Sequence, residues 1–543
     1  MDPATTSVHT RLIVAVPGLR SMLAPWESFR AVVQATPAYA SDRWLLHDTK
    51  LGPFSSQGLR HFAINLAAAI EMAVSFPHDP VDEIILLGHS VGGLLIRSAY
   101  LLATNPDYLT PGTGSWAKKV SRIVLFATPN RGVKIVGAPF ILGTLGERAL
   151  PVVRDTLRGS DFLTDLKIGW ILHFRRAVAN SVQDLPVIVQ VLGTEDAWVS
   201  TEDSVDVEQL PNGDMYPLLP DTDHDHVHRW DWLPADQQQQ RQDLLRYISF
   251  VWQPKPGETP SPSQDQIIQQ VVFVLPGIRD ANPDWAQQLA TQLRTIPNTA
   301  VVVGNYGYFS AAKFLLPGVR RRRIGWFQDA YTGALLDYPN AQDFHVVGHS
   351  NGTYILGHSL ERLGRMHFKR VYLAGSVLPE TYNWNARLQQ RQVQFVRNDM
   401  SGGDWPVGVL CRIMNVVLGM KDVGVGGFAG FNDFNRHSAQ CGEYHYYDGD
   451  HGATIQSSNH ASIKAFIQNG GGTPTMPMTG KVTPFVKRWN THGPAVAGAV
   501  LVIFLLVFIV GIILCLTGHA VGWWLTGSVV ALLGVIFYIL DTV

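Results

Sequence analysis

Short apolar runs alternate with longer helical stretches along most of the chain. Many of their residues are β-branched, as in residues 122–127, 187–192, 271–275 and 371–374. Continuous apolar runs separated by helices indicate strands buried in a parallel sheet, with crossover helices on both faces. The pattern predicts a doubly wound α/β sheet, and it predicts that sheet twice.

The two α/β regions share a repeated pattern. Residues 12–20, Leu-Ile-Val-Ala-Val-Pro-Gly-Leu-Arg, correspond to residues 271–279, and residues 84–92 correspond to residues 344–352. The offsets between the copies, 259 and 260 residues, are nearly constant. Self-similarity at a fixed offset predicts a tandem duplication.

Segments rich in proline and glycine mark the domain boundaries. Residues 253–266 contain several prolines, which remove backbone donors and block both helices and central strands. We therefore expect a first domain over residues 8–252 and a second over residues 267–469. A Gly/Pro-rich and basic linker over residues 470–490 follows the second domain.

The C-terminal region has the composition of a membrane segment. Residues 489–540 contain no Asp, Glu, Lys or Arg. Residues 494–516 and 520–540 each supply about the 20 residues that a helix needs to cross a bilayer, which predicts a transmembrane hairpin over residues 494–540. The alternative, a buried hairpin of a soluble core, seldom lacks every charge over such a length. Cations just before the first span place both domains in the cytoplasm.

Composition excludes several other classes of protein. The chain has 543 residues, of which 46% are hydrophobic and 16% charged, so it can form large cores. Its net charge of -1 gives no field for gathering nucleic acid. Three cysteines are too few for a disulfide framework and fit a reducing compartment. The first residues lack the apolar core of a secretory signal.

Two pentapeptides carry the candidate chemistry. Gly88-His-Ser-Val-Gly92 and Gly348-His-Ser-Asn-Gly352 each follow an apolar strand and precede a helical stretch. This context is typical of a nucleophile elbow, in which a strained turn presents a serine at the tip of a strand. The serines lie 73 and 74 residues after the proline of a Pro-Gly turn. The alternative for either copy is a non-catalytic Rossmann-like turn.

These motifs resemble the α/β-hydrolase family over about residues 8–250 and 268–468. The first copy also resembles lipase-like esterases at residues 126–132, Phe-Ala-Thr-Pro-Asn-Arg-Gly. The resemblance implies a Ser-acid-His triad in each domain and no metal or organic cofactor. It also implies an oxyanion hole made by the backbone N–H groups of Leu19 and Val91 in the first copy and of Ile278 and Asn351 in the second.

Two arginines follow the predicted oxyanion loops. Arg20 and Arg279 each come directly after an oxyanion residue. They would either bind a carboxylate or phosphate of the substrate or be exposed or paired structurally.

For the first triad, the family order Ser, acid, His points to Ser90, Asp196 and His224, since the acid follows a strand and the histidine lies in a later loop. Glu195 is the second choice of acid. His226 and His228 are the other candidate bases. Alternate histidines in an extended strand would share one face, so a metal site is the competing interpretation of this cluster.

For the second triad, the same order gives Ser350, Asp404 and His451. Asp399 is the second choice of acid, because it also follows the strand predicted at residues 393–396. Two further histidines compete with His451, namely His445 and His460.

The resemblance implies a serine hydrolase of the carboxylesterase or lipase type. The predicted hairpin would anchor it to a membrane, where lipid or acyl esters are the locally concentrated substrates. Thioester or amide cleavage is the first alternative, because the same triad performs it, and a membrane-bound scaffold or sensor without catalysis is the second. Residues 320–323, four arginines followed by aromatics, would suit an anionic membrane surface or a phosphate-bearing substrate, or else form a charged helix face. Residues 133–185 and 406–440 break the α/β alternation and are either lids or surface insertions. A homo-oligomer is compatible with this reading.

Overall fold

The chain divides into two compact units, Met1–Pro262 and Ser263–Val543. The division falls inside the proline-rich segment 253–266, which lies outside the described residues. The computed structural model describes residues 10–19, 23–75, 80–104, 115–133, 150–180, 182, 185–199, 217–229, 267–278, 284–305, 310–434, 440–471 and 481–542.

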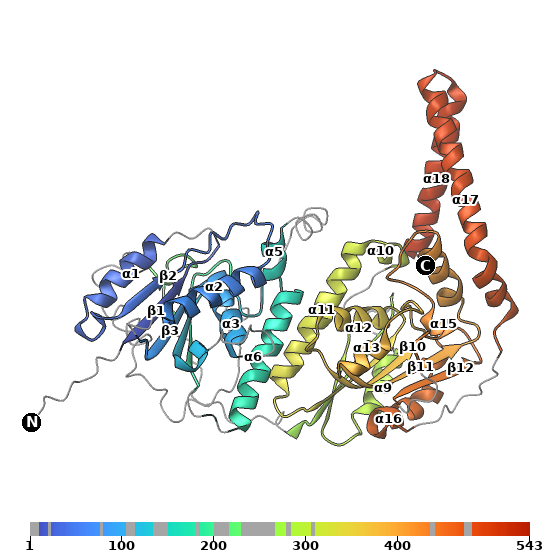
Figure 1. The fold of residues 1–543 in the computed structure, drawn as a ribbon. Coiled ribbons are helices and arrows are strands. Elements are labelled where there is room, and N and C mark those ends of the chain that lie inside the picture. Colours follow the sequence, from blue (N-terminus) through green and yellow to red (C-terminus); the bar gives the residue numbers. More distant parts are fainter. Residues whose placement is uncertain are drawn as a thin grey trace, which may run out of the picture. The chain divides into compact units, whose positions relative to one another are not determined.

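Unit 1 contains a six-stranded parallel sheet in the order β2-β1-β3-β4-β5-β6 (Figure 1). From β1 to β5, each strand is connected to the next through helices, the usual crossover between parallel strands. The elements are β1 (Arg11–Val16), α1 (Ala24–Gln34), η1 (Pro37–Tyr39), β2 (Arg43–Leu46), α2 (Leu59–Val74), β3 (Glu83–His89), α3 (Val91–Thr104), η3 (Ser115–Lys119), β4 (Val120–Phe126), α5 (Pro151–Thr156), α6 (Asp161–Ala179), β5 (Val187–Gly193) and β6 (Leu218–Leu219).

Alternate residues of the strands of unit 1 fill two separate cores. Leu12 and Val14 of β1 belong to a cluster that includes the buried faces of α2 and α3. Ile13 and Ala15 belong to a second cluster on the opposite face, with Trp26 of α1. Because successive side chains of a strand point to opposite faces, an uninterrupted apolar run is what a sheet covered on both faces requires.

Unit 2 contains a second six-stranded parallel sheet, in the order β12-β11-β10-β9-β7-β8. Counted from its first strand, this is the order found in unit 1. The elements are β7 (Gln270–Leu275), α9 (Asp284–Leu293), β8 (Thr299–Val303), α10 (Ala311–Phe314), α11 (Pro317–Asp337), β9 (Asp343–His349), α12 (Asn351–Arg362), β10 (Phe368–Ala374), α13 (Trp384–Gln389), β11 (Val393–Ser401), the π-helix η6 (Pro406–Cys411), α14 (Arg412–Val416), α15 (Gly426–Ala429), β12 (Cys441–Tyr447), η7 (Ala453–Ile455), η8 (Ser457–Asn459) and α16 (His460–Asn469).

The cores of unit 2 follow the same rule. Val272 and Val274 of β7 pack with α9 and α16 on one face. Phe273 points to the other face, where its ring lies 5.4 Å from Phe327 of α11, centroid to centroid. The two units therefore share a doubly wound α/β architecture, as the sequence pattern predicts. The tandem duplication is an interpretation of this likeness and stays a prediction.

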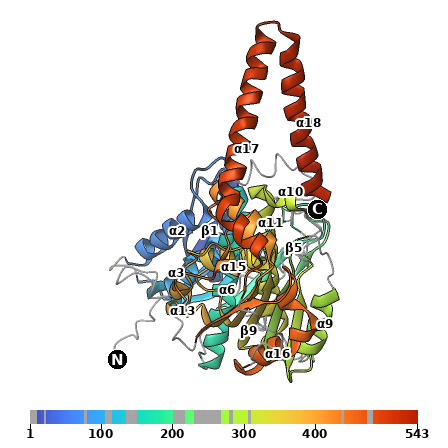
Figure 2. The same ribbon diagram turned by 90° about the vertical axis from the view of Figure 1, so that its right-hand side faces the viewer.

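Two long helices, α17 (Pro484–Leu516) and α18 (Ala520–Thr542), end the chain and extend side by side from unit 2 (Figures 1 and 2). In the described part of the chain, α17 is the one helix long and apolar enough to cross a membrane, and only 6% of its apolar window is buried. The fully described apolar part of α18, Ala520–Ile536, is shorter. A second span therefore stays a prediction.

Candidate active sites

Both candidate nucleophiles occupy the strained turn expected of an elbow. Ser90 connects β3 to α3 with φ of 51°, and Ser350 connects β9 to α12 with φ of 52°. Non-glycine residues in this left-handed region cost about 1–3 kcal/mol and persist only where the surrounding structure imposes them. Backbone hydrogen bonds from Ser90 N to Phe126 O (2.8 Å) and from Ser350 N to Ala374 O (3.0 Å) hold both turns against the next strand.

The last glycine of each pentapeptide is required by close packing. A Cβ atom on Gly92 would lie 2.4 Å from the carbonyl oxygen of Val16, and one on Gly352 would lie 2.2 Å from that of Leu275. Neither carbonyl can move freely, because each ends a central strand. These contacts explain why the elbow needs glycine two residues after the serine.

In unit 1 a continuous hydrogen-bond relay joins Ser90, His224 and Asp196. Ser90 Oγ lies 2.9 Å from His224 Nε2, and His224 Nδ1 lies 2.8 Å from Asp196 Oδ2. The carboxylate can only accept, so Nδ1 carries the proton and Nε2 is left to accept from the serine hydroxyl. The other oxygen of Asp196 accepts from the backbone N–H groups of Trp198 and Val199 at 2.9 and 2.8 Å, which fixes the carboxylate.

The other candidates in unit 1 have different surroundings. Glu195 is exposed, and His226 pairs with Asp223 in a local turn (Nδ1–Oδ1 2.6 Å). His228 is buried, 2% exposed. Residues 224–228 form turns rather than the extended strand on which the metal interpretation depends. Among the described residues, no group of three or more His, Cys, Asp or Glu side chains is arranged to hold a metal ion.

In unit 2 the acid and the base are paired. His451 Nδ1 donates to Asp404 Oδ2 at 2.9 Å, and Asp404 is fully buried. Burial acts to lower the pKa of His451, but the charge of Asp404 and its hydrogen bond raise that pKa above its ordinary value. No hydrogen bond joins Ser350 to His451 within the described part of the chain. Hydrogen bonds of this kind are often long before substrate binds.

The competing residues of unit 2 have other partners. Asp399 lies within β11, which runs five residues beyond the predicted strand, and it forms a buried ion pair with Arg397 at 2.7 Å. His460 is buried, and its Nε2 donates to the carbonyl of Ile455 at 2.9 Å. His445 lies near Glu443 on the edge strand β12, with Nε2 3.6 Å from Oε2.

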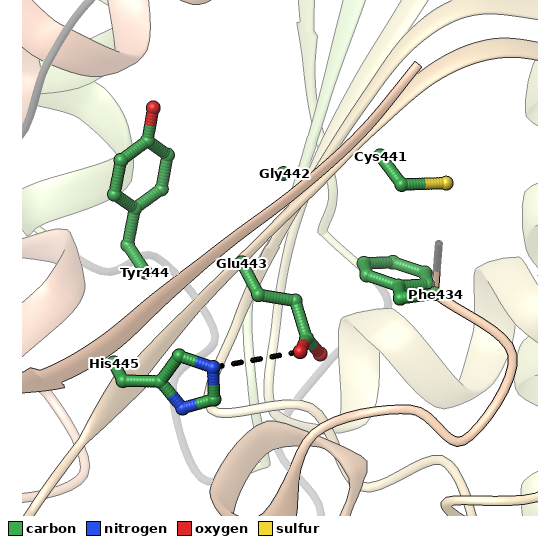
Figure 3. Close-up of a pocket in the computed structure, with 6 residues that line it drawn as sticks. All are labelled: Phe434, Cys441, Gly442, Glu443, Tyr444 and His445. Atoms are coloured by element: carbon green, nitrogen blue, oxygen red, sulfur yellow. Dashed lines mark ion pairs between the residues drawn. The ribbon is translucent and has the colours of Figure 1, made fainter. Parts of the chain in front are cut away.

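His445 and Glu443 line a cavity of about 330 Å³ at β12. Because Asp399 pairs with Arg397 and His445 lies beside Glu443, neither residue is paired with Asp404 or His451. Figure 3 shows the residues that line this cavity, namely Phe434, Cys441, Gly442, Glu443, Tyr444 and His445.

The predicted oxyanion residues border the two serines. Val91 and Asn351 begin the helices that follow the elbows. The loops that carry Leu19 and Ile278 pass so close that a Cβ atom on the preceding glycine would lie 2.8 Å from Ser90 Cβ in unit 1 and 3.0 Å from Ser350 Cβ in unit 2. Two further predicted residues, Arg20 and Arg279, lie outside the described residues.

Sequence analysis missed one pair of residues, the histidines before the serines. His89 Nε2 donates to the carbonyl of His224 at 2.8 Å, and His349 Nε2 donates to the carbonyl of His451 at 3.2 Å. Burial lowers the pKa of each elbow histidine to about 3, so both are neutral donors at physiological pH. In each unit, the histidine of the elbow is therefore hydrogen-bonded to the backbone of the residue that serves as the candidate base. The shared Gly-His-Ser triplet was the available signal.

The arginine cluster divides into buried and exposed parts. Arg320 is 3% exposed and donates to Asp422 at 3.0 Å and to the Phe314 carbonyl at 2.6 Å. Arg320 therefore has a structural partner in Asp422, and the alternatives of an anionic surface, a phosphate-bearing substrate or a charged helix face stay open for the cluster. Arg321 and Arg322 are exposed.

No protein-family model matches the chain, and no curated protein sequence matches it significantly. Among solved structures, the peroxisomal alpha-beta-hydrolase Lpx1 of Saccharomyces cerevisiae is similar at 12% identity over 47% of this chain and 82% of its own, with a TM-score of 0.30. Est1E of Butyrivibrio proteoclasticus with bound ferulic acid matches at 18% identity over 44% and 89%, with a TM-score of 0.28. Phospholipase PlaB of Legionella pneumophila matches at 15% identity over 34% and 38%, with a TM-score of 0.25.

Proposed function

We propose that this protein is a membrane-anchored serine hydrolase that cleaves carboxylic esters, with Ser90, Asp196 and His224 as the triad of unit 1. The observation that carries the proposal is the relay in which a serine with left-handed backbone lies 2.9 Å from an imidazole that is itself held at 2.8 Å by a buried carboxylate. A nucleophile, a base and an orienting acid in hydrogen-bond contact are what covalent acyl transfer requires.

Each residue of the relay has one step in the reaction. His224 takes the proton of Ser90 as Oγ attacks the ester carbonyl, and it then protonates the departing alcohol. Asp196 keeps the imidazole in the required tautomer and stabilises the imidazolium. The backbone N–H groups of Leu19 and Val91 receive the oxyanion. Water then releases the acyl group by the same proton transfers in reverse, and no metal or organic cofactor takes part.

In unit 2 we assign the same roles to Ser350, His451 and Asp404, with Ile278 and Asn351 at the oxyanion. The support is the Asp404–His451 hydrogen bond of 2.9 Å and the common elbow geometry. In this proposal the hydrogen bond between His451 and Ser350 forms when substrate binds. This reading gives the chain two hydrolase sites and favours a tandem duplication.

The substrate class follows from the anchor. A hydrolase fixed to a bilayer meets lipid and acyl esters at high effective concentration. The exposed apolar surface of α17 supports one span, and the apolar composition of residues 520–540 favours a second. Lys481, Lys487 and Arg488 precede the first span, so the positive-inside tendency puts both units on the cytoplasmic side.

Hydrolysis of carboxylic esters by the protein in vesicles tests the proposal. Wild type is compared with Ser90→Ala, with Ser350→Ala and with the double variant, on a soluble ester and on a lipid ester. We expect each single variant to lose part of the activity and the double variant to lose all of it. Full activity in the double variant contradicts the proposal. Activity on thioesters or amides but not on esters keeps the triads and changes the bond that they cleave.

A further inference from the structure

The exposed large apolar residues of unit 2 gather around the base of α17 and α18. Outside the apolar segments 494–516 and 520–540 of those helices, the described part of the unit exposes seven such side chains. Six of them lie in α17 itself or within two residues of an element that contacts α17 or α18. The seventh, Ile267, lies at the start of the described part of unit 2, before β7. The six are Leu316 (39% exposed), Trp405 (43%), Val416 (50%), Leu418 (50%), Phe485 (58%) and Trp489 (38%), here called the apolar collar.

Contacts along the first turns of α17 fix the height of the collar relative to the membrane span. Thr483 N donates to Gly402 O at 2.9 Å, and Asn490 Nδ2 donates to Gly408 O of η6 at 2.6 Å. A Cβ atom on Gly493 would lie 3.8 Å from Ile413 Cδ1 of α14. Along α17, the segment at Gly402 therefore makes the contact farthest from Pro494, η6 makes the next, and α14 makes the nearest.

The rise per residue of an α-helix gives the distance of each contact from the start of the apolar segment. At about 1.5 Å per residue, Asn490 lies only about 6 Å and Gly493 about 1.5 Å before Pro494, where the apolar segment begins. The head-group layer is roughly 5–8 Å thick on each side of the hydrocarbon core. If α17 spans the bilayer, these contacts place η6 and α14 at the level of the head groups.

Charge and residue type at the collar suit the same partner. Lys421, Lys487 and Arg488 are exposed beside it. The rings of Phe485 and Trp489 are 6.3 Å apart on one side of α17. Aromatic residues are enriched at the membrane–water interface, and cations near it bind anionic lipid.

We propose that the apolar collar docks unit 2 onto the surface of an anionic bilayer. The inference rests on the anchoring part of the proposed function. Trp405 directly follows Asp404, and Val407 N donates to Asp404 Oδ1 at 3.0 Å, so the acid of the second site leads directly into η6. The second site then takes its ester substrate from the bilayer.

Depth measurements at single cysteines test the docking without catalysis. An environment-sensitive fluorophore is attached at Leu418→Cys, or at Ile267→Cys as the matched control from the same unit, which is 63% exposed. Both variants carry Cys441→Ser and Cys515→Ser, and buried Cys411 is retained. The proteins are reconstituted in phosphatidylcholine–phosphatidylserine vesicles whose acyl chains are brominated.

We expect blue-shifted emission and quenching by brominated lipid at position 418 and neither at position 267. Equal, water-like emission at both positions in protein that floats with the vesicles overturns the docking and leaves the anchor intact. Protein that does not float overturns both. The reactivity of the two serines, measured separately, is unaffected by either outcome, so failure of the hydrolase proposal is distinguished.

Discussion

Replacement of His89 tests whether its hydrogen bond to the His224 carbonyl positions His224 as the base. His89→Leu substitutes an apolar side chain of similar size and so removes the N–H that donates to the His224 carbonyl at 2.8 Å. His89→Gln keeps a donor at a similar reach. The pair therefore separates the hydrogen bond from packing, including the stacking of His89 on His228 at 4.0 Å between ring centroids.

The size of the effect follows from the burial of the bond. A buried carbonyl that loses its partner costs about 1–3 kcal/mol. If that cost appears as displacement of His224, the reaction at Ser90 slows by about 5- to 150-fold, because each 1.36 kcal/mol is tenfold in rate. His349→Leu has a smaller effect on Ser350, since its bond to the His451 carbonyl is longer, at 3.2 Å.

The assay is the rate at which a fluorophosphonate modifies Ser90, followed by mass spectrometry of the labelled peptide. Thermal unfolding of the same samples monitors the fold. We expect slow labelling for His89→Leu and recovery for His89→Gln. Wild-type labelling by folded His89→Leu would refute the positioning role, and equal losses in both variants would assign the effect to packing.

Further predictions concern the acids and pH. Asp196→Asn and Asp404→Asn leave their units folded but reduce labelling of the serine in the same unit by about 10⁴-fold, as loss of the correct tautomer does in serine hydrolases. Asp399→Ala strands the buried Arg397 cation and lowers the stability of unit 2 in denaturant titration by about 3–5 kcal/mol. Labelling in unit 2 requires neutral His451, so its rate rises with pH through a midpoint above 6.5, and Asp404→Asn lowers that midpoint. The elbow histidines bind protons below pH 6.5 when unfolded but only near pH 3 when folded. Stability therefore falls as pH decreases through this window, by up to about 1.4 kcal/mol per pH unit for each, in pH-dependent melting.

The strands and the elbows could be predicted because their signals are local. An apolar run buried on both faces is visible within six or seven residues. The elbow is marked by glycines at positions where neighbouring backbone leaves no room for a Cβ atom. Asp196 could also be predicted, since it lies three residues after the end of β5. The roles given to these residues stay predictions until they are tested.

Choices that depend on distant partners could not be decided from the sequence. Asp399 and Asp404 look alike locally, and what separates them is the hydrogen bond of Asp404 to His451, 47 residues later, whereas Asp399 pairs with Arg397 of its own strand. Arg320 is neutralised by Asp422, about a hundred residues later. The histidine cluster was ambiguous because turns and strands place alternate residues differently. A backbone carbonyl as the partner of an elbow histidine leaves no trace in side-chain identity.

The most direct test of two serine hydrolase sites is fluorophosphonate labelling of the detergent-purified chain, with the adducts located by mass spectrometry. The account predicts adducts on Ser90 and on Ser350, each lost on replacement of that serine by alanine. An adduct on one serine alone would assign the chemistry to that unit and make the other a binding domain. Absence of both adducts from a folded chain would contradict the account.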